Sequence, residues 1–309
     1  MNICPITYLP CGEERYSEKG LKLLNPRLAG LNLFNYSTQE QLAESLARVD
    51  KMSIQGVQPK LSVKLNVGKS TFEIVDIYGD YILKPQHPHY PELPENENIS
   101  MKLAESLGIE IPVNGLLFAK DNSAAYFVKR FDRLPRNKKL HTEDFCQIAG
   151  LNRDTKYDYS MEKLVPLLDE NCTFPALEKQ KLFERILFNW LIGNEDMHLK
   201  NYSLITRNNK IELSPGYDFL NSTIVINAKE EIALTLSGKK SNFNRNDLIE
   251  YYGIQRLGLS KLFINKLLER IKSVYPDWIQ KINNCFLSQT MKEKYLNLLE
   301  IRMKKINLI

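Results

Sequence analysis

The stretch that decides the fold of this chain is IGNEDMHLKNYS, at residues 192–203. Within it, Asp196 stands five positions before Asn201, which is the spacing of a kinase catalytic loop. In such a loop the aspartate accepts the proton of the substrate hydroxyl, and the asparagine holds a metal ion. The stretch therefore predicts a site for phosphoryl transfer.

A second carboxylate is expected further along the chain, in SPGYDF at residues 214–219. Asp218 follows a short expected strand, Lys210 to Leu213, where a carboxylate can bind the magnesium ion that bridges the nucleotide phosphates. Phosphoryl transfer needs such a set because the protein contributes little covalent chemistry and instead positions groups and neutralises charge. Asp196, Asn201 and Asp218 are therefore candidates for one site.

The N-terminal part of the chain supplies a candidate cation. Lys84 ends the apolar run Tyr81 to Leu83, and a strand there would hold its ammonium group rigidly over phosphates. Glu97, which opens the next expected helix, is the candidate partner of this lysine. Glu92 and Glu95 are nearby alternatives to Glu97.

A candidate phosphate loop lies further upstream, in SIQGVQPK at residues 53–60, whose backbone amides are expected to turn toward phosphate. It contains one glycine and matches neither of the two common glycine-rich phosphate-binding patterns. Each candidate also has a structural interpretation: Asp196 and Asn201 as polar turn residues, Lys84 as a solvated strand end, and Asp218 as a turn former. The order of the parts along the chain favours the functional interpretation, because chance produces the whole ordered set far less often than any single part.

Composition places the chain among ordinary globular proteins. Of its 309 residues, 43% are hydrophobic and 26% charged, which excludes a disordered, collagenous or coiled-coil chain. A formal net charge of +5 is too small to indicate nucleic-acid binding over the whole surface. No stretch reaches the roughly 20 apolar residues of a spanning helix, and the N-terminal row shows no secretory signal.

The cysteines are odd in number, scattered, and without CxxC pairs, which is typical of reduced thiols in a cytoplasmic protein. They are Cys4, Cys11, Cys146, Cys172 and Cys285. We therefore expect a cytoplasmic protein without a membrane partner. The basic residues near the C-terminal end are expected to form a solvated helix face rather than a nucleic-acid contact; they are Arg302, Lys304 and Lys305.

Apolar spacing predicts a β-rich part followed by a helical part. Strands are expected at Lys60–Leu65, Thr71–Ile77, Tyr81–Leu83, Val113–Ala119 and Ala124–Val128, with Gly79 and Asp80 as a turn, and later at Tyr202–Ile205 and Lys210–Leu213. Helices are expected at Ser37–Val49, with Ser37 and Glu40 as a capping box, and at Glu97–Leu107, Glu178–Leu191, Lys261–Val274 and Met291–Ile306. The change of pattern near Phe131 indicates a bilobal α+β enzyme with a cleft between its halves.

The chain resembles the HipA-like serine/threonine kinases, the toxin kinases of bacterial toxin–antitoxin systems. The resemblance runs from about Ser53 to Tyr252, and its most specific part is Asp-x-His-x-Lys-Asn. The motifs that carry it are SIQGVQPK (53–60), YILK (81–84), VKRFDR (128–133), EDFCQ (143–147), NWLIGNEDMHLKN (189–201), PGYDF (215–219) and LTLSGKK (234–240). It implies a protein-kinase-like fold, with residues 1–130 as the N-terminal lobe and 131–309 as the helical C-terminal lobe.

The resemblance also implies roles for individual residues. Asp196 would be the catalytic base, Asn201 and Asp218 the Mg²⁺ ligands, and Lys84 a contact to the phosphates of ATP. The implied phosphate loop consists of Gln55, Gly56, Val57, Gln58, Pro59 and Lys60. The implied adenine hinge consists of Lys129, Arg130 and Phe131. The nucleotide site would be completed by His198, Leu199, Lys200, Asn201, Tyr217 and Asp218. Autophosphorylation would fall on Ser53.

Partners follow from the same resemblance. The chain is similar to the short HipT-type members, in which a separate small protein supplies a subdomain that precedes the phosphate loop in longer members. The family implies an aminoacyl-tRNA synthetase as the protein substrate, phosphorylated on a serine, with antitoxin proteins as partners and nucleic acid reached only through an antitoxin. Two alternatives stay open: a small-molecule kinase, and an ATP-binding pseudokinase that acts as a scaffold or repressor subunit.

Overall fold

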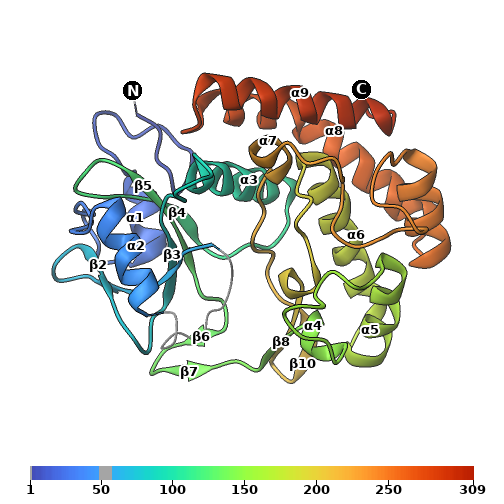
Figure 1. Ribbon diagram of the computed structural model, residues 1–309, viewed down its shortest axis with the longest axis horizontal. Coiled ribbons are helices and arrows are strands. Elements are labelled where there is room, and N and C mark those ends of the chain that lie inside the picture. The colour runs from blue at the N-terminus through green and yellow to red at the C-terminus, as the bar shows by residue number, and fades with distance from the viewer. Residues whose placement is uncertain (1, 49–57) are drawn as a thin grey trace. The chain divides into compact units, whose positions relative to one another are not determined.

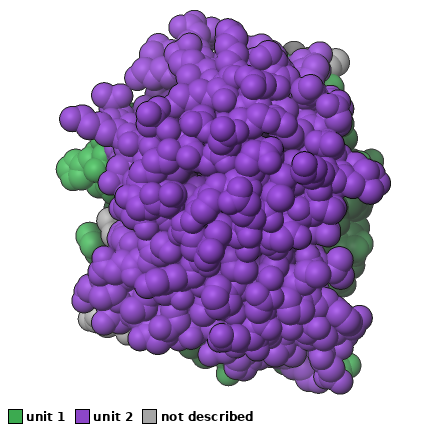
Figure 2. All heavy atoms as spheres, turned by 90° about the vertical axis from the view of Figure 1, so that its right-hand side faces the viewer, with its two compact units in different colours: residues 1–102, 112–137, 284–287 green, residues 103–111, 138–283, 288–309 purple. Residues whose placement is uncertain are grey.

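The computed structural model describes residues 2–48 and 58–309, and Figure 1 labels most of their helices and strands. The chain divides into two compact units, coloured separately in Figure 2. Unit 1 comprises Met1–Lys102, Pro112–Asn137 and Asn284–Leu287. Unit 2 comprises Leu103–Ile111, Lys138–Asn283 and Ser288–Ile309.

Unit 1 is built on an antiparallel sheet. In its described part, five strands follow the order β2-β1-β3-β5-β4. They are β1 (Leu61–Asn66), β2 (Thr71–Ile74), β3 (Tyr81–Lys84), β4 (Asn114–Phe118) and β5 (Ala124–Lys129), with the short β6 (Arg133–Leu134) following. Gly79 and Asp80, expected as a turn, do not join β2 and β3 into a hairpin: both strands pair with β1, where Val63 faces Ile74 on one side and Tyr81 on the other. Val63 is fully buried, as suits the middle of a sheet.

The helices of unit 1 are α1 (Glu18–Leu24), α2 (Thr38–Ala47) and the first part of α3 (Leu93–Leu107). The expected capping box of α2 is confirmed: the backbone N–H of Ser37 donates to Glu40 Oε2 at 2.6 Å, and the N–H of Glu40 donates to Ser37 Oγ at 3.4 Å. The helix α1 was not predicted, and its Leu21 and Leu24 join the core formed by the sheet. This core therefore holds the strand that carries Lys84.

The expected end of α3 is confirmed, but its start is four residues earlier than predicted, at Leu93. The helix ends at Leu107, and Gly108 then takes a φ of +88°, a left-handed conformation that glycine adopts without strain. Glu97 consequently lies in the second turn of the helix instead of opening it.

Unit 2 contains most of the helices. Its described elements are β7 (Lys138–Lys139), β8 (Thr142–Asp144), α4 (Phe145–Ile148), a 3₁₀ turn (Met161–Lys163), α5 (Leu164–Asn171), α6 (Pro175–Ile192), a 3₁₀ turn (Leu199–Asn201), β9 (Ser203–Arg207), β10 (Lys210–Leu213), α7 (Ser222–Ile226), a π-helix (Asn246–Arg256), α8 (Lys261–Asn284) and α9 (Gln289–Lys305). Among them, β10, β9 and β8 form a small antiparallel sheet in that order.

The helix α6 leads into the stretch 192–203, whose residues after Gly193 are called the catalytic row below because catalysis is expected there. Its second half is buried almost without interruption, and Phe188, Trp190 and Ile192 are each inaccessible to solvent. It ends at Gly193, which has a φ of +81°. A Cβ at this position would collide with the side chains of Leu298 and Asn221, so the turn requires glycine for space as well as for conformation.

The C-terminal helices differ from expectation in two respects. The helix α8 continues through Pro276 to Asn284 instead of ending at Val274, because its apolar side, including the fully buried Trp278, packs along its whole length. The prediction of a solvated face on α9 is wrong for Arg302, which is buried and donates a hydrogen bond to the backbone carbonyl of Trp190 at the end of α6. None of the helices within residues 2–48 and 58–309 has the length and apolarity to cross a membrane.

Candidate active site

The buried amide of Asn194 organises the row that follows α6. Its Nδ2 donates to Asn189 Oδ1 at 2.9 Å and to the backbone carbonyl of Asp218 at 3.0 Å. Its Oδ1 accepts a 3.4 Å hydrogen bond from the backbone N–H of Asp196. One side chain therefore links the end of α6, the candidate base and the second candidate carboxylate, a role that the sequence did not reveal.

Asp196 and Asn201 are brought together by a tight turn. The backbone carbonyl of Asp196 accepts hydrogen bonds from the N–H of His198 at 2.8 Å and from Asn201 Nδ2 at 3.0 Å. Using Nδ2 in this way orients the amide of Asn201, so that its oxygen is the atom left to accept or to ligate. The spacing of five residues is thus the spacing needed for the asparagine to reach back to the aspartate.

Asp218 lies in a segment that is anchored on several sides. Ser214 donates its N–H to the carbonyl of Ser203 at 2.9 Å, and Gly216 donates its N–H to the carbonyl of Glu110 at 2.7 Å. The hydroxyl of Tyr217 lies 2.5 Å from Ser203 Oγ and donates to the carbonyl of Lys200 at 3.0 Å. Asp218 itself has a φ of +57°, a conformation that asparagine and aspartate tolerate better than most residues. This turn joins the segment to the catalytic row.

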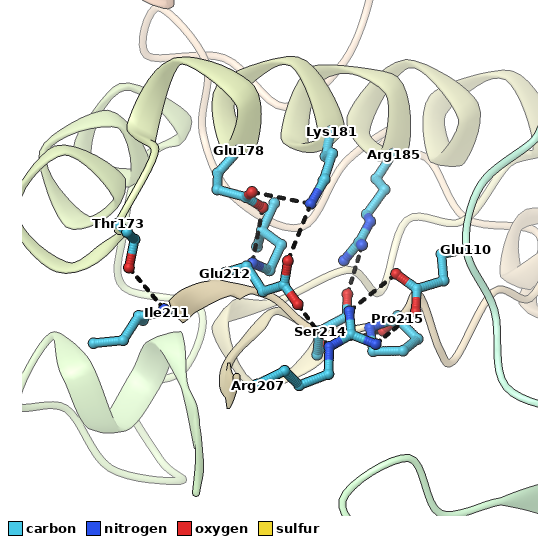
Figure 3. A network of polar contacts seen from close by, with 11 residues as sticks. Glu110, Thr173, Glu178, Lys181, Arg185, Arg207, Ile211, Glu212, Ser214 and Pro215 are labelled. Carbon is cyan, nitrogen blue, oxygen red and sulfur yellow. Dashed lines mark hydrogen bonds and ion pairs between the residues drawn. The ribbon is translucent and has the colours of Figure 1, made fainter. Parts of the chain in front are cut away.

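A polar network, drawn in Figure 3, supports the same segment from below α6. The buried Arg185 reaches from the helix to the carbonyl of Ser214 at 2.5 Å, and Glu178 Oε2 accepts the N–H of Leu213 at 2.9 Å. Arg207 on β9 donates to both carboxylate oxygens of Glu110, at 2.7 and 3.1 Å. The hydrogen bonds from Arg207 hold the pKa of Glu110 below its ordinary value. Glu178 and Arg185 of α6 therefore fix the end of the strand that precedes Asp218.

A loop before α5 contacts the catalytic row directly, and this contact was not predicted from the sequence. The hydroxyl of Tyr157 donates to Asp196 Oδ1 at 2.5 Å, and its ring meets the ring of His198 edge to face, with centroids 5.1 Å apart. Lys156 Nζ lies 2.8 Å from His198 Nε2. The backbone carbonyl of Lys156 accepts a hydrogen bond from the N–H of Leu199 at 3.3 Å. Burial raises the pKa of Tyr157, and the Asp196 carboxylate raises it further.

The remaining residues of the row have structural partners. Lys200 Nζ forms an ion pair with Asp144 Oδ2 at 2.9 Å, and Asp144 also caps α4 through the N–H of Gln147. Leu199 is fully buried and His198 nearly so. Burial lowers the pKa of His198, and the charge of Asp196 opposes that shift. His198 Nε2 therefore faces the ammonium of Lys156 as a hydrogen-bond acceptor.

The donor set suits a magnesium ion. Asn201 offers an amide oxygen and Asp218 a carboxylate, and hard oxygen ligands are those that magnesium prefers. In the described residues, no group of three histidine, cysteine, aspartate or glutamate side chains is placed to hold a metal ion alone. A magnesium ion bound by one carboxylate, one amide, water and phosphate oxygens fits that composition, because magnesium keeps several waters and relies on substrate phosphates.

In unit 1, the expected pairing of Lys84 with Glu97 is confirmed. Lys84 Nζ lies 2.6 Å from Glu97 Oε1, and both side chains are buried. The ammonium also lies 5.7 Å from the ring centroid of Tyr126. Glu95, one of the alternatives, instead accepts hydrogen bonds from Gln86 at 2.8 and 2.9 Å. Lys84 is therefore held in one place at the end of β3.

The expected hinge begins at Lys129, the last residue of β5, and continues through Arg130 and Phe131. The N–H of Lys129 donates to the carbonyl of Val113, and the N–H of Arg130 to the carbonyl of Asp80, both at 2.8 Å. The guanidinium of Arg130 turns back to both carboxylate oxygens of Asp132 at 3.1 Å. The expected contact of Lys129, Arg130 and Phe131 with adenine stays a prediction.

Only part of the expected phosphate loop lies in the described chain. Gln58, Pro59 and Lys60 are half-buried and lead directly into β1. The other expected members, Gln55, Gly56 and Val57, and the expected autophosphorylation residue Ser53, lie outside the described residues.

Comparison with known proteins identifies the family. The family model described as the HipA-like C-terminal domain matches residues 52–279, which contain Asp196, Asn201 and Asp218. The chain is a HipA-like protein. The expected resemblance is thereby confirmed.

Relatives of this HipA-like chain carry kinase names. A putative kinase of Haemophilus influenzae is 29% identical, and the alignment covers 100% of this chain and 98% of the relative. The putative kinase Y4dM of Sinorhizobium fredii is 33% identical over 78% of this chain and 62% of its own length. The serine/threonine-protein kinase toxin HipA of Shewanella oneidensis is 28% identical over 75% of this chain and 57% of its own. The chain thus spans little more than half of the last two relatives.

Solved structures confirm the expected fold class, a kinase-like α+β fold. HipA of Shewanella oneidensis MR-1, solved in complex with HipB and operator DNA, matches 91% of this chain and 73% of its own, with a TM-score of 0.69 at 24% identity. The proinflammatory kinase CtkA of Helicobacter pylori matches 79% of this chain and 93% of its own, with a TM-score of 0.53 at 19% identity. At these identities the likeness establishes the fold.

Proposed function

We propose that this HipA-like protein is an ATP- and Mg²⁺-dependent serine/threonine protein kinase that acts as a growth-arresting toxin. The observation that carries the proposal is the geometry around Asp196. Its carboxylate accepts a 2.5 Å hydrogen bond from the hydroxyl of Tyr157. The same carboxylate can therefore accept the proton of a substrate hydroxyl placed there. The kinase names of the relatives support the same chemistry.

Roles are proposed residue by residue. Asp196 accepts the proton of the substrate hydroxyl, and Asn201 and Asp218 hold Mg²⁺, which neutralises charge on the phosphates. Lys84, fixed by Glu97, contacts the phosphates of ATP. The other proposed nucleotide contacts are Gln55 to Lys60, Lys129 to Phe131, His198 to Lys200, and Tyr217. The lobes are proposed to comprise residues 1–130 and 131–309.

Substrate and partners are proposed from the family. The substrate is a cellular protein phosphorylated on serine, with an aminoacyl-tRNA synthetase as the proposed target, and Ser53 is the proposed site of autophosphorylation. An antitoxin is the proposed partner, including a small protein for the segment that longer members carry, and nucleic acid is reached through the antitoxin. The HipB named with the Shewanella HipA structure supports an antitoxin. No disulfide joins cysteines in the described chain, which supports the proposed cytoplasmic location.

The test uses purified protein and γ-labelled ATP. We expect the wild type to transfer label to itself and to a protein of a cell extract, with phosphopeptide mapping locating the autophosphorylation on Ser53. Asp196→Asn should lose both transfers while it still binds ATP. Label that appears only on small molecules would favour the small-molecule kinase, and ATP binding without any transfer by the wild type would favour the pseudokinase.

A further inference from the structure

The ammonium group of Lys156 lies against His198, two positions after the candidate base, and has no carboxylate partner among the described residues. Its Nζ is 2.8 Å from His198 Nε2 and 4.9 Å from the ring centroid of Tyr157. Within residues 2–48 and 58–309, no carboxylate lies at ion-pair distance from Lys156. Lys200, the residue before Asn201 in the same row, differs in forming an ion pair with Asp144 at 2.9 Å.

A half-buried ammonium without a counter-ion carries an electrostatic cost, because burial disfavours its charged form. That cost is visible in the lowered pKa of Lys156, for which burial is the main cause and which the charge of Asp196 partly opposes. An ammonium can only donate hydrogen bonds, so His198 Nε2 accepts one of its protons and the other two remain for an anion. The structure thus presents a place for anionic oxygens next to Asp196.

The position of Lys156 is fixed by its neighbours. The next residue, Tyr157, donates to Asp196 Oδ1 at 2.5 Å, and the carbonyl of Lys156 itself accepts the N–H of Leu199 at 3.3 Å. The loop is therefore attached to the catalytic row both through its backbone and through two consecutive side chains. A flexible lysine on an unattached loop would not be held at this place.

We propose that Lys156 is a further catalytic residue, whose ammonium contacts the oxygens of the phosphoryl group as it is transferred. The proposal rests on the proposed kinase function. In the step, the substrate oxygen forms a bond to the γ-phosphorus, the bond between that phosphorus and the oxygen of ADP breaks, and the substrate proton passes to Asp196. Lys156 keeps its protons and neutralises charge on the equatorial oxygens, the role that a cation has in phosphoryl transfer.

The decisive measurement is the binding of a transition-state analogue, which needs no turnover. The affinity for Mg²⁺·ADP is measured with and without aluminium fluoride, for the wild type, Lys156→Met, Lys156→Gln and Lys156→Arg. Lys163→Met is the matched control, because Lys163 also stands over a tyrosine ring, that of Tyr159 at 5.4 Å. Melting temperatures verify that each variant is folded.

We expect aluminium fluoride to tighten ADP binding to the wild type and to Lys163→Met. In Lys156→Met and Lys156→Gln that gain should fall by roughly 100-fold with ADP affinity itself unchanged, and Lys156→Arg should keep most of it. An equal gain in Lys156→Met and the wild type would overturn the role of Lys156 and leave the kinase proposal intact. If aluminium fluoride gives the wild type no gain, the kinase proposal and this inference fail together.

Discussion

The hydroxyl of Tyr157 donates a 2.5 Å hydrogen bond to Oδ1 of Asp196, across 39 positions of sequence. A substrate hydroxyl that gives its proton to Asp196 must use the same carboxylate. We therefore expect Tyr157→Phe, which keeps the ring and removes the donor, to lower KM for the protein substrate by up to about tenfold without lowering kcat. Steady-state kinetics with the labelled substrate measures both.

Tyr159→Phe is the control for this substitution, because Tyr159 lies in the same loop and its hydroxyl donates to the carbonyl of Lys163 instead. It should leave both constants unchanged. A fall in kcat for Tyr157→Phe, with KM constant, would show that the tyrosine orients Asp196 and does not compete with the substrate.

The proposed metal site predicts a specific loss in Asp218→Asn. Because the substitution removes a charge and keeps the shape, we expect Mg²⁺ to strengthen ATP binding to the wild type and not to the variant. Calorimetric titration with Mg²⁺ and with EDTA measures the difference. Asp169→Asn is a suitable control, since Asp169 pairs with Lys179 at 2.7 Å on α5 and α6. If ATP binding to Asp218→Asn still depends on Mg²⁺, Asp218 is not a ligand of the metal ion.

The buried pair of Lys84 and Glu97 predicts a large stability effect. Lys84→Met removes the ammonium that lies 2.6 Å from Glu97 and should reduce the free energy of unfolding by about 3 kcal/mol, as removal of one partner of a buried pair does. The double variant Lys84→Met/Glu97→Met should recover part of this loss. Lys120→Met, which breaks the exposed pair with Glu40, should change little. If Lys84→Met lowers the free energy of unfolding in urea only slightly, the buried ion pair does not contribute as proposed.

The carboxylate of Glu110 predicts a pH dependence of stability. Its pKa is lowered in the folded protein, chiefly by hydrogen bonds from Arg207. Such a group stabilises the folded state above its unfolded pKa of about 4.3, and the contribution is lost as pH falls through the folded pKa. Glu110→Gln should therefore melt below the wild type at neutral pH, with the difference shrinking in acid. A difference that stays constant with pH would show that Arg207 does not stabilise the charge.

The features predicted correctly from the sequence are those that depend on residues close together in the chain. The capping box of Ser37 and Glu40 lies within one helical turn, and the pairing of Lys84 with Glu97 was expected from a strand end followed by a helix. The order β2-β1-β3 was not predicted, because the burial that makes Val63 central depends on both neighbouring strands. The passage of α8 through Pro276 likewise depends on tertiary packing, which outweighs the stop signal of a proline.

The candidate site was predicted where its residues are close in sequence. Asp196 and Asn201 are joined by one turn, so their spacing carries the information. Lys156 and Tyr157 reach the same turn from about 40 positions away, through contacts that no periodicity encodes. The prediction for Arg302 was wrong for a similar reason. Its charge indicated a solvated helix face, whereas α9 buries the side chain against the end of α6.

The central claim, that this chain transfers phosphate to a cellular protein through Asp196, is tested most directly by a phosphoproteome comparison. Cells expressing the wild type are compared with cells expressing Asp196→Asn at equal protein level. We expect the wild type to arrest growth and to produce a serine phosphopeptide that is absent with the variant. Identical phosphopeptides in the two cultures, with growth arrest in both, would contradict the claim.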